Sequence, residues 1–548
     1  MDKLAAAVIE REQRLRSARS AEEHTWKEAY EFLLPTKSTF TYNVSSGVTR
    51  EADLLDSTGA RALEQFAAFL FSTLNNPASK WVRVKPVGPK ATKAFLLRQD
   101  VKLAIEETEE LIADFLTNSV RVYEMLHETY LNLGVTGNGT TAQELVDEGL
   151  RAWCPHPVDV VFELDRFFRP GPHFVQAWLT PEQLYARYGA EALYGENEPV
   201  GDDEEVRKRR AQDKMIRVLD VDIPRNPDMY SLSEFLGDND KAAFGWVNFV
   251  VNTETKRVVS KFIKTNTPKF NTGRWLVPPG GTLGRGPGIT SLPDNRMANR
   301  MSATIVRAGE KVVDPPWAVY NGSLVSPLRL FSGGITHIEG DRKPEPLLAP
   351  GSSRVDITDA LLAAKQMAIR EAFAAPLFMT PDSPVKSATE VLQQVDERNR
   401  SVAPMLIRVQ EEVLRRVVAR ALDLGDASGA LGDTPQALQG VPLRFQYADP
   451  LRASQAQTEA LGTSRLFELL MPWAQVDIGV LDMFDPDKVA AVAHRGSGAP
   501  AHIERTETEV KAIRKERAEA AARAEAMAAA KDVAIPAAAV AAQSKSGK

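Results

Sequence analysis

The sequence predicts an α+β fold in which long helices dominate. Apolar residues recur at helical spacing along residues 2–33 and 58–74. After Gly137 the pattern changes to short apolar runs separated by turn residues, which is typical of strands. Three capping boxes, each a serine followed three residues later by an acidic residue, open further helical segments at Ser291, Ser353 and Ser387.

The N-terminal half is predicted to begin with helices and to continue as strands. The helix at 2–33 stops at Pro35, and the apolar helix at 58–74 is expected to be buried. Further helices are expected at 93–117 and 119–132. The predicted strands are Val158–Phe162, His173–Leu179 after a Pro-Gly-Pro turn at 170–172, and a hairpin of Trp246–Val251 with Val258–Ile263. The charge-rich run at 196–213 is predicted to be an exposed loop.

The C-terminal half is predicted to be mainly helical. The helix after Ser291 runs to about Val313, and the helix after Ser353 ends before Pro376. A proline-rich insert at 314–352 separates them. The helix after Ser387 is expected to bend at Pro404 and to end near Gly425. The remaining predictions are a strand at 441–447, helices around 452–471, 485–493 and 504–530, and disorder from Ala537.

Composition restricts the class of protein. The chain has 548 residues and a net charge of −6, which disfavours a tight static grip on DNA phosphates but permits a channel through which DNA slides. One cysteine, Cys154, allows no internal disulfide and fits the bacterial cytoplasm. The first residues carry charges within their apolar run, unlike a signal peptide. The most apolar long stretch, Leu466–Phe484, is interrupted by charges and proline, so no membrane span is expected.

No catalytic, metal or nucleotide-binding constellation is evident in the sequence. Cys154 and His156 have no second Cys–His pair, so a buried thiol beside a turn is favoured over a zinc site. Residues 137–141 (GNGTT) lack the lysine of a phosphate loop and are predicted to form a tight turn. The glycines at 280–288 are assigned to backbone freedom before a helix. We therefore expect no enzyme activity, no metal and no cofactor.

Five short motifs follow one another along residues 20–510. They are Trp26-Lys27-Glu28 with Leu34-Pro35, Leu55-Asp56-Ser57-Thr58-Gly59, Leu74 with Pro77 and Trp81, Leu283-Gly284-Arg285-Gly286-Pro287, and Leu481-Asp482 with Asp485 and Gly498-Ala499-Pro500. In this order, with two helices around a proline-rich insert and then a long kinked helix, they resemble the portal (head-to-tail connector) proteins of short-tailed, podovirus-type bacteriophages. Each motif alone is weak. Leu283 stands where the family often has tyrosine, which keeps an apolar packing residue.

The resemblance implies a portal fold with named parts in a ring-forming subunit. The parts are a wing (1–286, with the long helix and strand at 388–447), two stem helices (287–313 and 354–375), a clip (314–353), a tunnel loop (376–387), and a helical crown with a C-terminal tail (448–548).

The same resemblance implies a structural function. Portal proteins form a ring, most often a dodecamer, at one vertex of the capsid in the virion, after assembly in the host bacterial cytoplasm. Double-stranded DNA passes through the ring non-specifically during packaging and ejection. The partners implied are the terminase large subunit, a tail adaptor protein, and the major capsid and scaffolding proteins. No membrane partner is implied.

Two sets of residues are candidates for that function. The channel set contains Lys365 and Arg370 of the second stem helix together with Asp382, Ser383 and Lys386 of the tunnel loop. Prolines at 381 and 384 prevent a helix there, and one acid with one base leaves the loop nearly neutral, which suits sliding DNA. The docking set in the clip contains Trp317, Tyr320, Arg329 and Phe331.

Each set has an alternative role. The clip aromatics serve equally well in packing between subunits. The basic residues fit ordinary surface positions or salt bridges, and the tunnel loop fits a plain connector. For the whole chain, the alternatives are a packaging ATPase or nuclease, whose phosphate loop and acidic metal ligands are missing from the sequence, and a capsid-assembly or scaffolding protein without a channel.

Overall fold

The computed structural model describes most of the chain as two compact units. The described residues are 2–38, 54–77, 80–92, 95, 98–118, 121–146, 149–194, 200–212, 214–225, 245–313, 317–318, 345–346, 355–373, 404, 406–432, 435–447, 450–474, 478–497, 503, 505 and 509–524. The first unit contains Met1–Trp81, Ala113–Gly432 and Tyr447–Leu451, and the second contains Val82–Ile112, Asp433–Gln446 and Arg452–Lys548.

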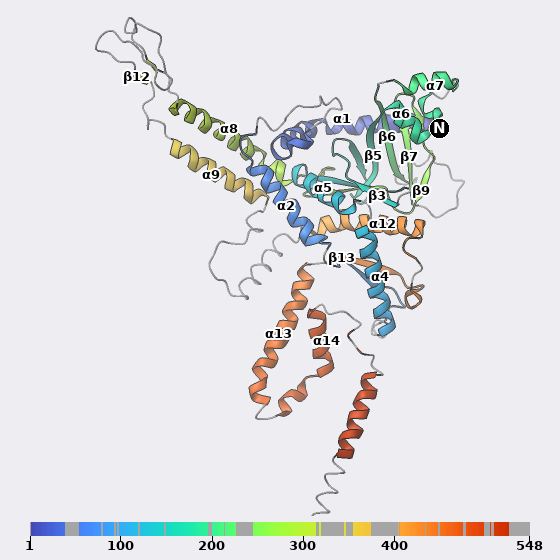
Figure 1. The fold of residues 1–548 in the computed structure, drawn as a ribbon, viewed down its shortest axis with the longest axis vertical. Helices are drawn as coiled ribbons and strands as arrows, with labels where there is room; N and C mark the ends of the chain where they lie inside the picture. Colours follow the sequence, from blue (N-terminus) through green and yellow to red (C-terminus); the bar gives the residue numbers. More distant parts are fainter. Residues whose placement is uncertain are drawn as a thin grey trace, which may run out of the picture. The chain divides into compact units, whose positions relative to one another are not determined.

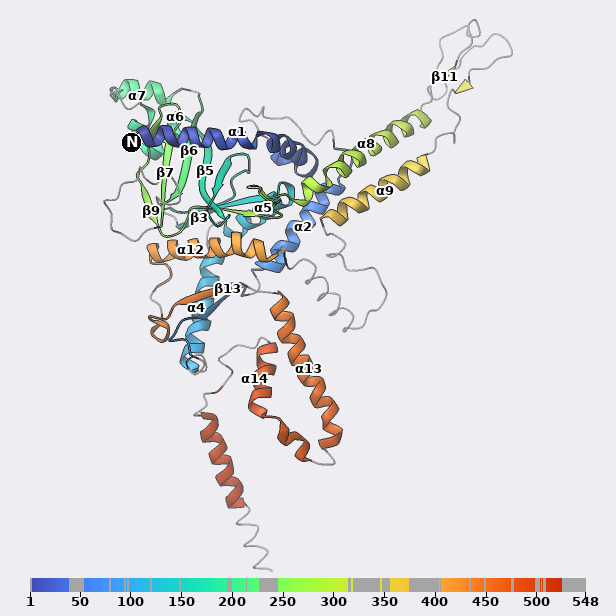
Figure 2. The same cartoon turned by 180° about the vertical axis from the view of Figure 1, so that it is seen from behind.

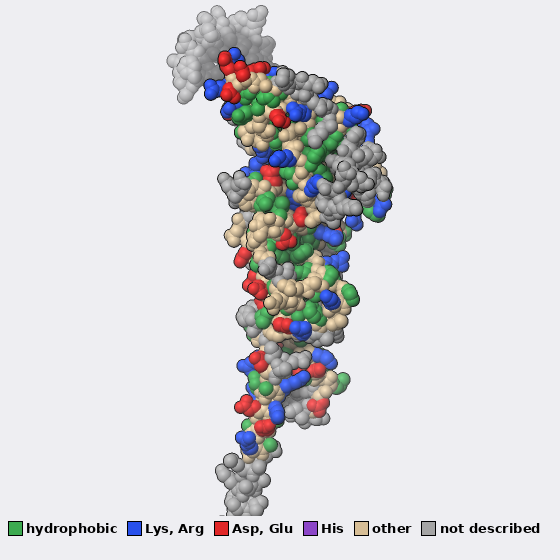
Figure 3. All heavy atoms as spheres, turned by 90° about the vertical axis from the view of Figure 1, so that its right-hand side faces the viewer, with side chains coloured by type: hydrophobic (Ala, Val, Ile, Leu, Met, Phe, Trp, Pro, Cys, Tyr) green, Lys and Arg blue, Asp and Glu red, His purple; other side chains and the backbone are tan. Residues whose placement is uncertain are grey.

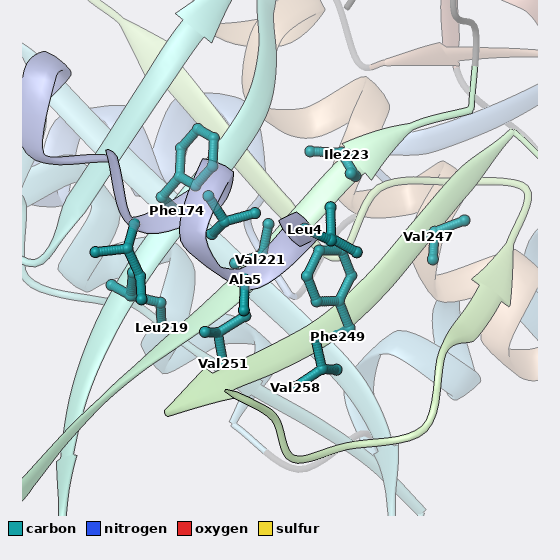
Figure 4. Close-up of a cluster of buried hydrophobic side chains, with 12 residues drawn as sticks. Leu4, Ala5, Phe174, Leu219, Val221, Ile223, Val247, Phe249, Val251 and Val258 are labelled. Carbon is teal, nitrogen blue, oxygen red and sulfur yellow. The ribbon is translucent and has the colours of Figure 1, made fainter. Parts of the chain in front are cut away.

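An antiparallel six-stranded sheet forms the larger core of the first unit. Its order is β4-β5-β6-β7-β8, and β9 also pairs with β7. The bounds are β4 Val160–Leu164, β5 Pro170–Leu179, β6 Ile216–Pro224, β7 Trp246–Asn252, β8 Arg257–Val258 and β9 Ile263–Thr265. Helix α1 (Asp2–Leu33) packs Leu4 and Val8 against the sheet, both nearly inaccessible to water. Figure 4 shows Leu4 among Phe174, Val221 and Phe249 of the sheet. Burial of these large apolar side chains holds the helix to the sheet.

A second sheet of three strands lies beside the first. Its order is β10 (Phe270–Arg274), β2 (Asn138–Val146) and β3 (Gly149–Trp153). Helix α5 (Val122–Val135) leads into β2 through Gly137, whose φ of 84° favours glycine. Helix α12 (Arg415–Ser428) follows a π-helical turn, η4 (Gln410–Leu414). Figures 1 and 2 show α1 on one side of the strands and α12 on the other.

Three helices of the first unit meet near the start of α8. They are α2 (Thr58–Leu74), α8 (Pro287–Val313) and α9 (Val355–Ala372). Helices α8 and α9 run side by side (Figures 1 and 2). Beyond them, strands β11 (Trp317–Ala318) and β12 (Glu345–Pro346) pair antiparallel. The remaining elements of this unit are η1 (Pro35–Lys37), α6 (Pro181–Tyr188), η2 (Ala190–Leu193) and α7 (Asp203–Arg210).

The second unit has a smaller core. Strands β1 (Val82–Pro86) and β13 (Leu443–Tyr447) pair, and α4 (Gln99–Asn118) buries Val101 and Ala104 against Leu438. Helix α13 contributes Phe467, whose ring meets that of Phe484 edge-on. The remaining elements are η5 (Gln436–Leu438), α13 (Pro450–Ala474), η6 (Ile478–Met483), α14 (Pro486–Ser497) and a helix at 509–524.

The structure corrects five expectations from the sequence. The strand predicted at 258–263 is not continuous, because β8 ends at Val258 and β9 begins at Ile263. The run at 196–213 is not only a loop, because α7 forms within it and Asp202 caps it by accepting a hydrogen bond from Glu205 N. Strand β5 begins at Pro170, which pairs with Leu164, so the Pro-Gly-Pro segment is strand. Helix α8 begins four residues before the capping box, and Ser291 lies buried inside it. Residues 137–141 do not form a tight turn, because strand β2 begins at Asn138 and only the bend at Gly137 precedes it.

Candidate functional site at the base of the paired helices

Polar contacts tie α8 and α9 to each other and to α1. Lys365 Nζ of α9 lies 2.9 Å from Asp294 Oδ1 of α8, with both side chains partly exposed. Arg296 of α8 forms an ion pair with Glu28 of α1, the glutamate of the W-x-E motif. The predicted channel residue Lys365 is therefore engaged between the two helices, whereas Arg370 is exposed. Whether either faces DNA remains a prediction.

The D-S-T-G motif joins the paired helices to α2. Asn299 Oδ1 of α8 accepts hydrogen bonds from Leu55 N (2.8 Å) and Asp56 N (3.3 Å). Asp56 Oδ1 accepts from Thr58 N (3.0 Å) and Thr58 Oγ1 (2.6 Å), which satisfies one of the free backbone amides at the start of α2. A Cβ on Gly59 would clash with Asn295 Oδ1, so glycine lets α2 approach α8 closely.

The G-R-G-P turn joins the start of α8 to the three-stranded sheet. Gly284 N donates to Asn138 Oδ1 (2.7 Å), and Asn138 Nδ2 donates back to Gly284 O (3.1 Å). A Cβ on Gly137 would lie 2.6 Å from Arg285 N, and one on Gly286 would lie 2.6 Å from Gly137 N. The glycines of this motif therefore serve close backbone contact as well as freedom of the chain.

A buried ion pair connects β10 to the π-helical turn. Arg274 Nη2 lies 2.8 Å from Glu412 Oε1, and Arg274 Nε lies 3.2 Å from Glu412 Oε2, in the two-point geometry that arginine favours with carboxylates. The side chains are only 5% and 14% exposed. Arg274 Nη2 also donates to Phe168 O, and Arg416 Nη1 donates to Pro170 O, each at 2.9 Å. Strand β10 and helix α12 thus hold the β4–β5 loop in place.

A buried polar network lies between the two sheets. Asp222 Oδ2 accepts from Lys269 N (2.6 Å) and Phe270 N (3.3 Å), and burial raises the pKa of Asp222 to about 7. His173 Nε2 lies 3.0 Å from Thr272 Oγ1, and burial lowers the pKa of His173 to about 3, which keeps the ring neutral. Both side chains are inaccessible to solvent. Their enclosure indicates that the network holds the sheets together rather than acting on a substrate.

Cys154 behaves as a packing residue. Asn132 Nδ2 donates to its Sγ at 3.2 Å, and burial raises the pKa of the thiol to about 11, so it stays protonated at neutral pH. His156 Nε2 lies 3.1 Å from Lys37 O. Within the described ranges, no three His, Cys, Asp or Glu side chains gather as a metal site. No described helix is long and apolar enough to cross a bilayer.

Most of the other predicted site residues lie outside the described part of the chain. Trp317 is described only as backbone, in β11 opposite Pro346. The predicted residues outside the described ranges are Tyr320, Arg329, Phe331, Asp382, Ser383 and Lys386. The capping boxes at Ser353 and Ser387 and the tail from Ala537 also lie outside them. The polar links of Asn299, Arg274 and Glu412 were not predicted, because no local pattern in the sequence marks them.

The described residues form a framework of helices and sheets joined by buried polar links. On the face seen in Figure 3, acidic and basic side chains are intermingled. The chain matches the family model described as bacteriophage head to tail connecting protein over residues 5–503, so it belongs to that family. The predicted membership of the head-to-tail connector (portal) family is thereby confirmed, together with the structural role of a portal protein at the capsid vertex. That the phage is of the short-tailed, podovirus type stays a prediction.

Two phage proteins are similar along nearly the whole chain. The probable portal protein of Bordetella phage BPP-1 is 22% identical over 524 residues, which cover 93% of this chain and 91% of that protein. The portal protein of Salmonella phage epsilon15 is 22% identical over 543 residues, which cover 94% and 91%.

Two solved structures of gene transfer agent particles are also similar. The virion of a native particle gives a TM-score of 0.33 at 12% identity, covering 85% of this chain and 98% of that chain. The neck of an empty particle, computed with C6 symmetry, gives 0.34 at 11% identity, covering 77% and 90%.

Proposed function

We propose that this chain is the subunit of a closed ring, a dodecamer, through which double-stranded DNA enters and leaves the capsid. The observation that carries the proposal is the exposed apolar surface of the paired helices. Val306 of α8 and Leu361 and Met367 of α9 are 51%, 50% and 61% exposed. Apolar side chains on both members of a helix pair are a suitable contact for a neighbouring copy.

The parts of the subunit are those that the resemblance to portal proteins implies. Residues 1–286 with 388–447 form the wing, 287–313 and 354–375 the stem, 314–353 the clip, 376–387 the tunnel loop and 448–548 the crown. The pairing of β11 with β12 supports a clip closed at its base, because it joins the two ends of that insert. Trp317, Tyr320, Arg329 and Phe331 dock the terminase large subunit and later the tail adaptor. Asp382, Ser383 and Lys386 line the narrowest part of the channel.

The ring is a structural component of the virion without enzymatic turnover of its own. The sequence has no phosphate loop and no set of acidic metal ligands after a strand. ATP hydrolysis for packaging therefore comes from the terminase. The subunits assemble in the host cytoplasm with the major capsid and scaffolding proteins. ATPase or nuclease turnover that co-purifies with the chain and is abolished by a point substitution within it would refute this part.

Native mass spectrometry and electron microscopy of the purified full chain test the ring. We expect a closed oligomer with a central hole, without nucleotide. Met367→Lys should weaken it, because a charge replaces an apolar contact, whereas Val200→Lys, at an exposed position (47%) away from the stem, should not. A folded chain that stays monomeric at micromolar concentration contradicts the proposal. Oligomers without a hole would favour the alternative of a scaffolding protein.

A further inference from the structure

The loop between β4 and β5 presents two phenylalanines to solvent. Phe167 and Phe168 are 59% and 76% exposed, and they stand between Arg166 and Arg169, which are exposed as well. We call residues 165–169 the aromatic tip. Arg166 lies over the ring of Phe167, 4.8 Å from its centroid, and neither arginine forms an ion pair with a described residue. Two adjacent exposed aromatic rings are unusual on a surface that faces only water.

The tip is held in one conformation by its own contacts. Asp165 Oδ1 accepts from Phe167 N (2.7 Å) and Arg169 N (2.9 Å), and Phe168 N donates to Asp165 O (2.9 Å). Phe168 has φ of 60°, a left-handed conformation that is strained for a bulky residue. Arg274 stabilises it by donating to Phe168 O. The aromatic rings are thus presented on a rigid support, which lowers the entropy lost on contact with a partner.

An apolar hollow lies beside the edge strand β4 in the same unit. Its volume is about 260 Å³, and its walls include Leu15 and Ala18 of α1, Val161 and Phe162 of β4, and Pro278 and Leu283 of the segment between β10 and α8. A cavity of about 150 Å³ accommodates benzene, so this hollow has room for one phenyl ring.

The rim of the hollow carries one free acid. Glu22 is exposed and forms no ion pair with a described residue. The other charged rim residue, Arg19, is already engaged by the carbonyl oxygens of Pro157 and Val158 and by Glu23. The charge available to a partner at the hollow is therefore negative, and that at the aromatic tip is positive.

We propose that the aromatic tip of one subunit inserts into the apolar hollow of a neighbouring copy of the chain. A phenyl ring of Phe167 or Phe168 fills the hollow, and Arg166 or Arg169 approaches Glu22. The two surfaces match in size, in apolar character and in sign of charge. Such a contact is heterologous, with different patches on the two copies, which is the type that closes a ring. The inference rests on the proposed ring and adds the contact that sets its register.

The first test compares variants of the tip in the full chain by native mass spectrometry and sedimentation. Phe167→Ser combined with Phe168→Asn removes both rings, and asparagine tolerates the left-handed backbone. We expect the ring to dissociate at a concentration about tenfold higher or more, as for an aromatic hot spot, with unchanged thermal unfolding of the subunit. Ile263→Asn, at an exposed position (54%) on β9, is the control and should assemble normally.

A charge exchange tests the direct contact. Glu22→Arg alone, and Arg166→Glu with Arg169→Glu, should each weaken association, and the three changes together should restore it. Ala18→Trp, which fills the hollow, should weaken association as the tip variant does. If the parent forms rings and the tip variant forms them equally well, the tip contact is wrong while the ring stands. If the charge exchange fails to restore association, the proposed tip contact is also wrong. A parent chain that stays monomeric overturns the ring and the tip contact together.

Discussion

At the scale of single residues, buried charges hold this subunit together at points far apart in the sequence. Arg274 and Glu412 are almost excluded from water and form a two-point ion pair. Removing one partner of such a pair leaves an uncompensated charge, which costs more than the pair itself contributes. The pair also fixes the backbone of Phe168. Its loss should therefore affect both stability and the aromatic tip.

We expect Arg274→Met to lower the free energy of unfolding of the first unit by about 3–5 kcal/mol, because Glu412 remains buried and unpaired. The double variant Arg274→Met/Glu412→Leu should recover most of that loss, since no charge is then buried. Urea unfolding followed by tryptophan fluorescence measures the free energy of unfolding of the single and the double variant. A single variant that costs less than about 1 kcal/mol would show that water reaches Glu412.

The buried carboxyl of Asp222 should make stability depend on pH. Its pKa is raised to about 7 in the folded chain, against about 3.9 in an unfolded one. The folded state therefore holds a proton that the unfolded state releases, and this contribution is complete below about pH 4 and is lost as pH rises through about 7. Unfolding free energy should fall from about pH 5 to 8 more steeply in the parent than in Asp222→Asn. Equal slopes would contradict the raised pKa.

At the scale of elements, glycine decides how closely helices meet. A Cβ on Gly59 of α2 would clash with Asn295 of α8 and lie 2.8 Å from Leu33 Cδ2, whereas one on Gly309 of α8 meets nothing within 4 Å. The two positions lie in helices, so alanine at either gains the same helix propensity. The free space around each glycine therefore decides whether alanine stabilises or destabilises the chain there.

Gly59→Ala should destabilise the chain by about 1–3 kcal/mol, because α2 must move away from α8. Gly309→Ala should instead stabilise it by roughly 0.5–1 kcal/mol, since alanine favours the helix and has free space. Thermal unfolding of the two variants beside the parent measures the difference. A stabilising Gly59→Ala would mean that α2 and α8 adjust without cost.

At the scale of the whole molecule, the stretch 379–386 (MTPDSPVK) tests the proposed channel. It lies outside the described residues, and its role is a prediction from the family plan. We expect deletion of Asp382–Pro384 to leave rings intact but to reduce the amount of genome packaged or retained per capsid, because a sliding contact around the DNA is lost. Capsids with the deletion that hold full-length genomes as the parent does would make the stretch a plain connector.

Elements with a local signal in the sequence could be predicted before the structure was known. The helices at 2–33 and 58–74 were predicted at their observed bounds, because an apolar face repeats along each and a proline or asparagine follows. The strand predicted at 441–447 and the first hairpin strand at 246–251 were also found, within a few residues. The second hairpin strand, predicted at 258–263, was wrong as one strand, because only β8 and β9 form at its two ends. Order and spacing of the motifs identified the family, which the match over 5–503 confirmed.

The predictions for α7 and for the start of α8 were wrong for reasons that lie in the local sequence. Helix α7 was missed because its charged run has a single buried residue, Val206, and so no apolar face, although Asp202 with Glu205 is a capping signal. The capping box at Ser291, followed by an apolar repeat, predicted a later start for α8 than the stem range 287–313 that the resemblance implied. The helix instead starts at Pro287, where proline suits a first turn, and Asn295 Nδ2 donates to the buried Ser291 Oγ.

The contacts that the motifs make, and the places where distant residues meet, became known from the folded chain. Asn299 holds Leu55, and Arg274 holds Glu412 and Phe168, across separations of more than 100 residues. Such pairs leave no periodic trace, because a single contact between distant segments imposes no pattern on their neighbours. The aromatic tip and the hollow likewise depend on which side chains the fold leaves exposed. Local periodicity therefore determined the elements and the family, while packing between distant segments determined the links that join them.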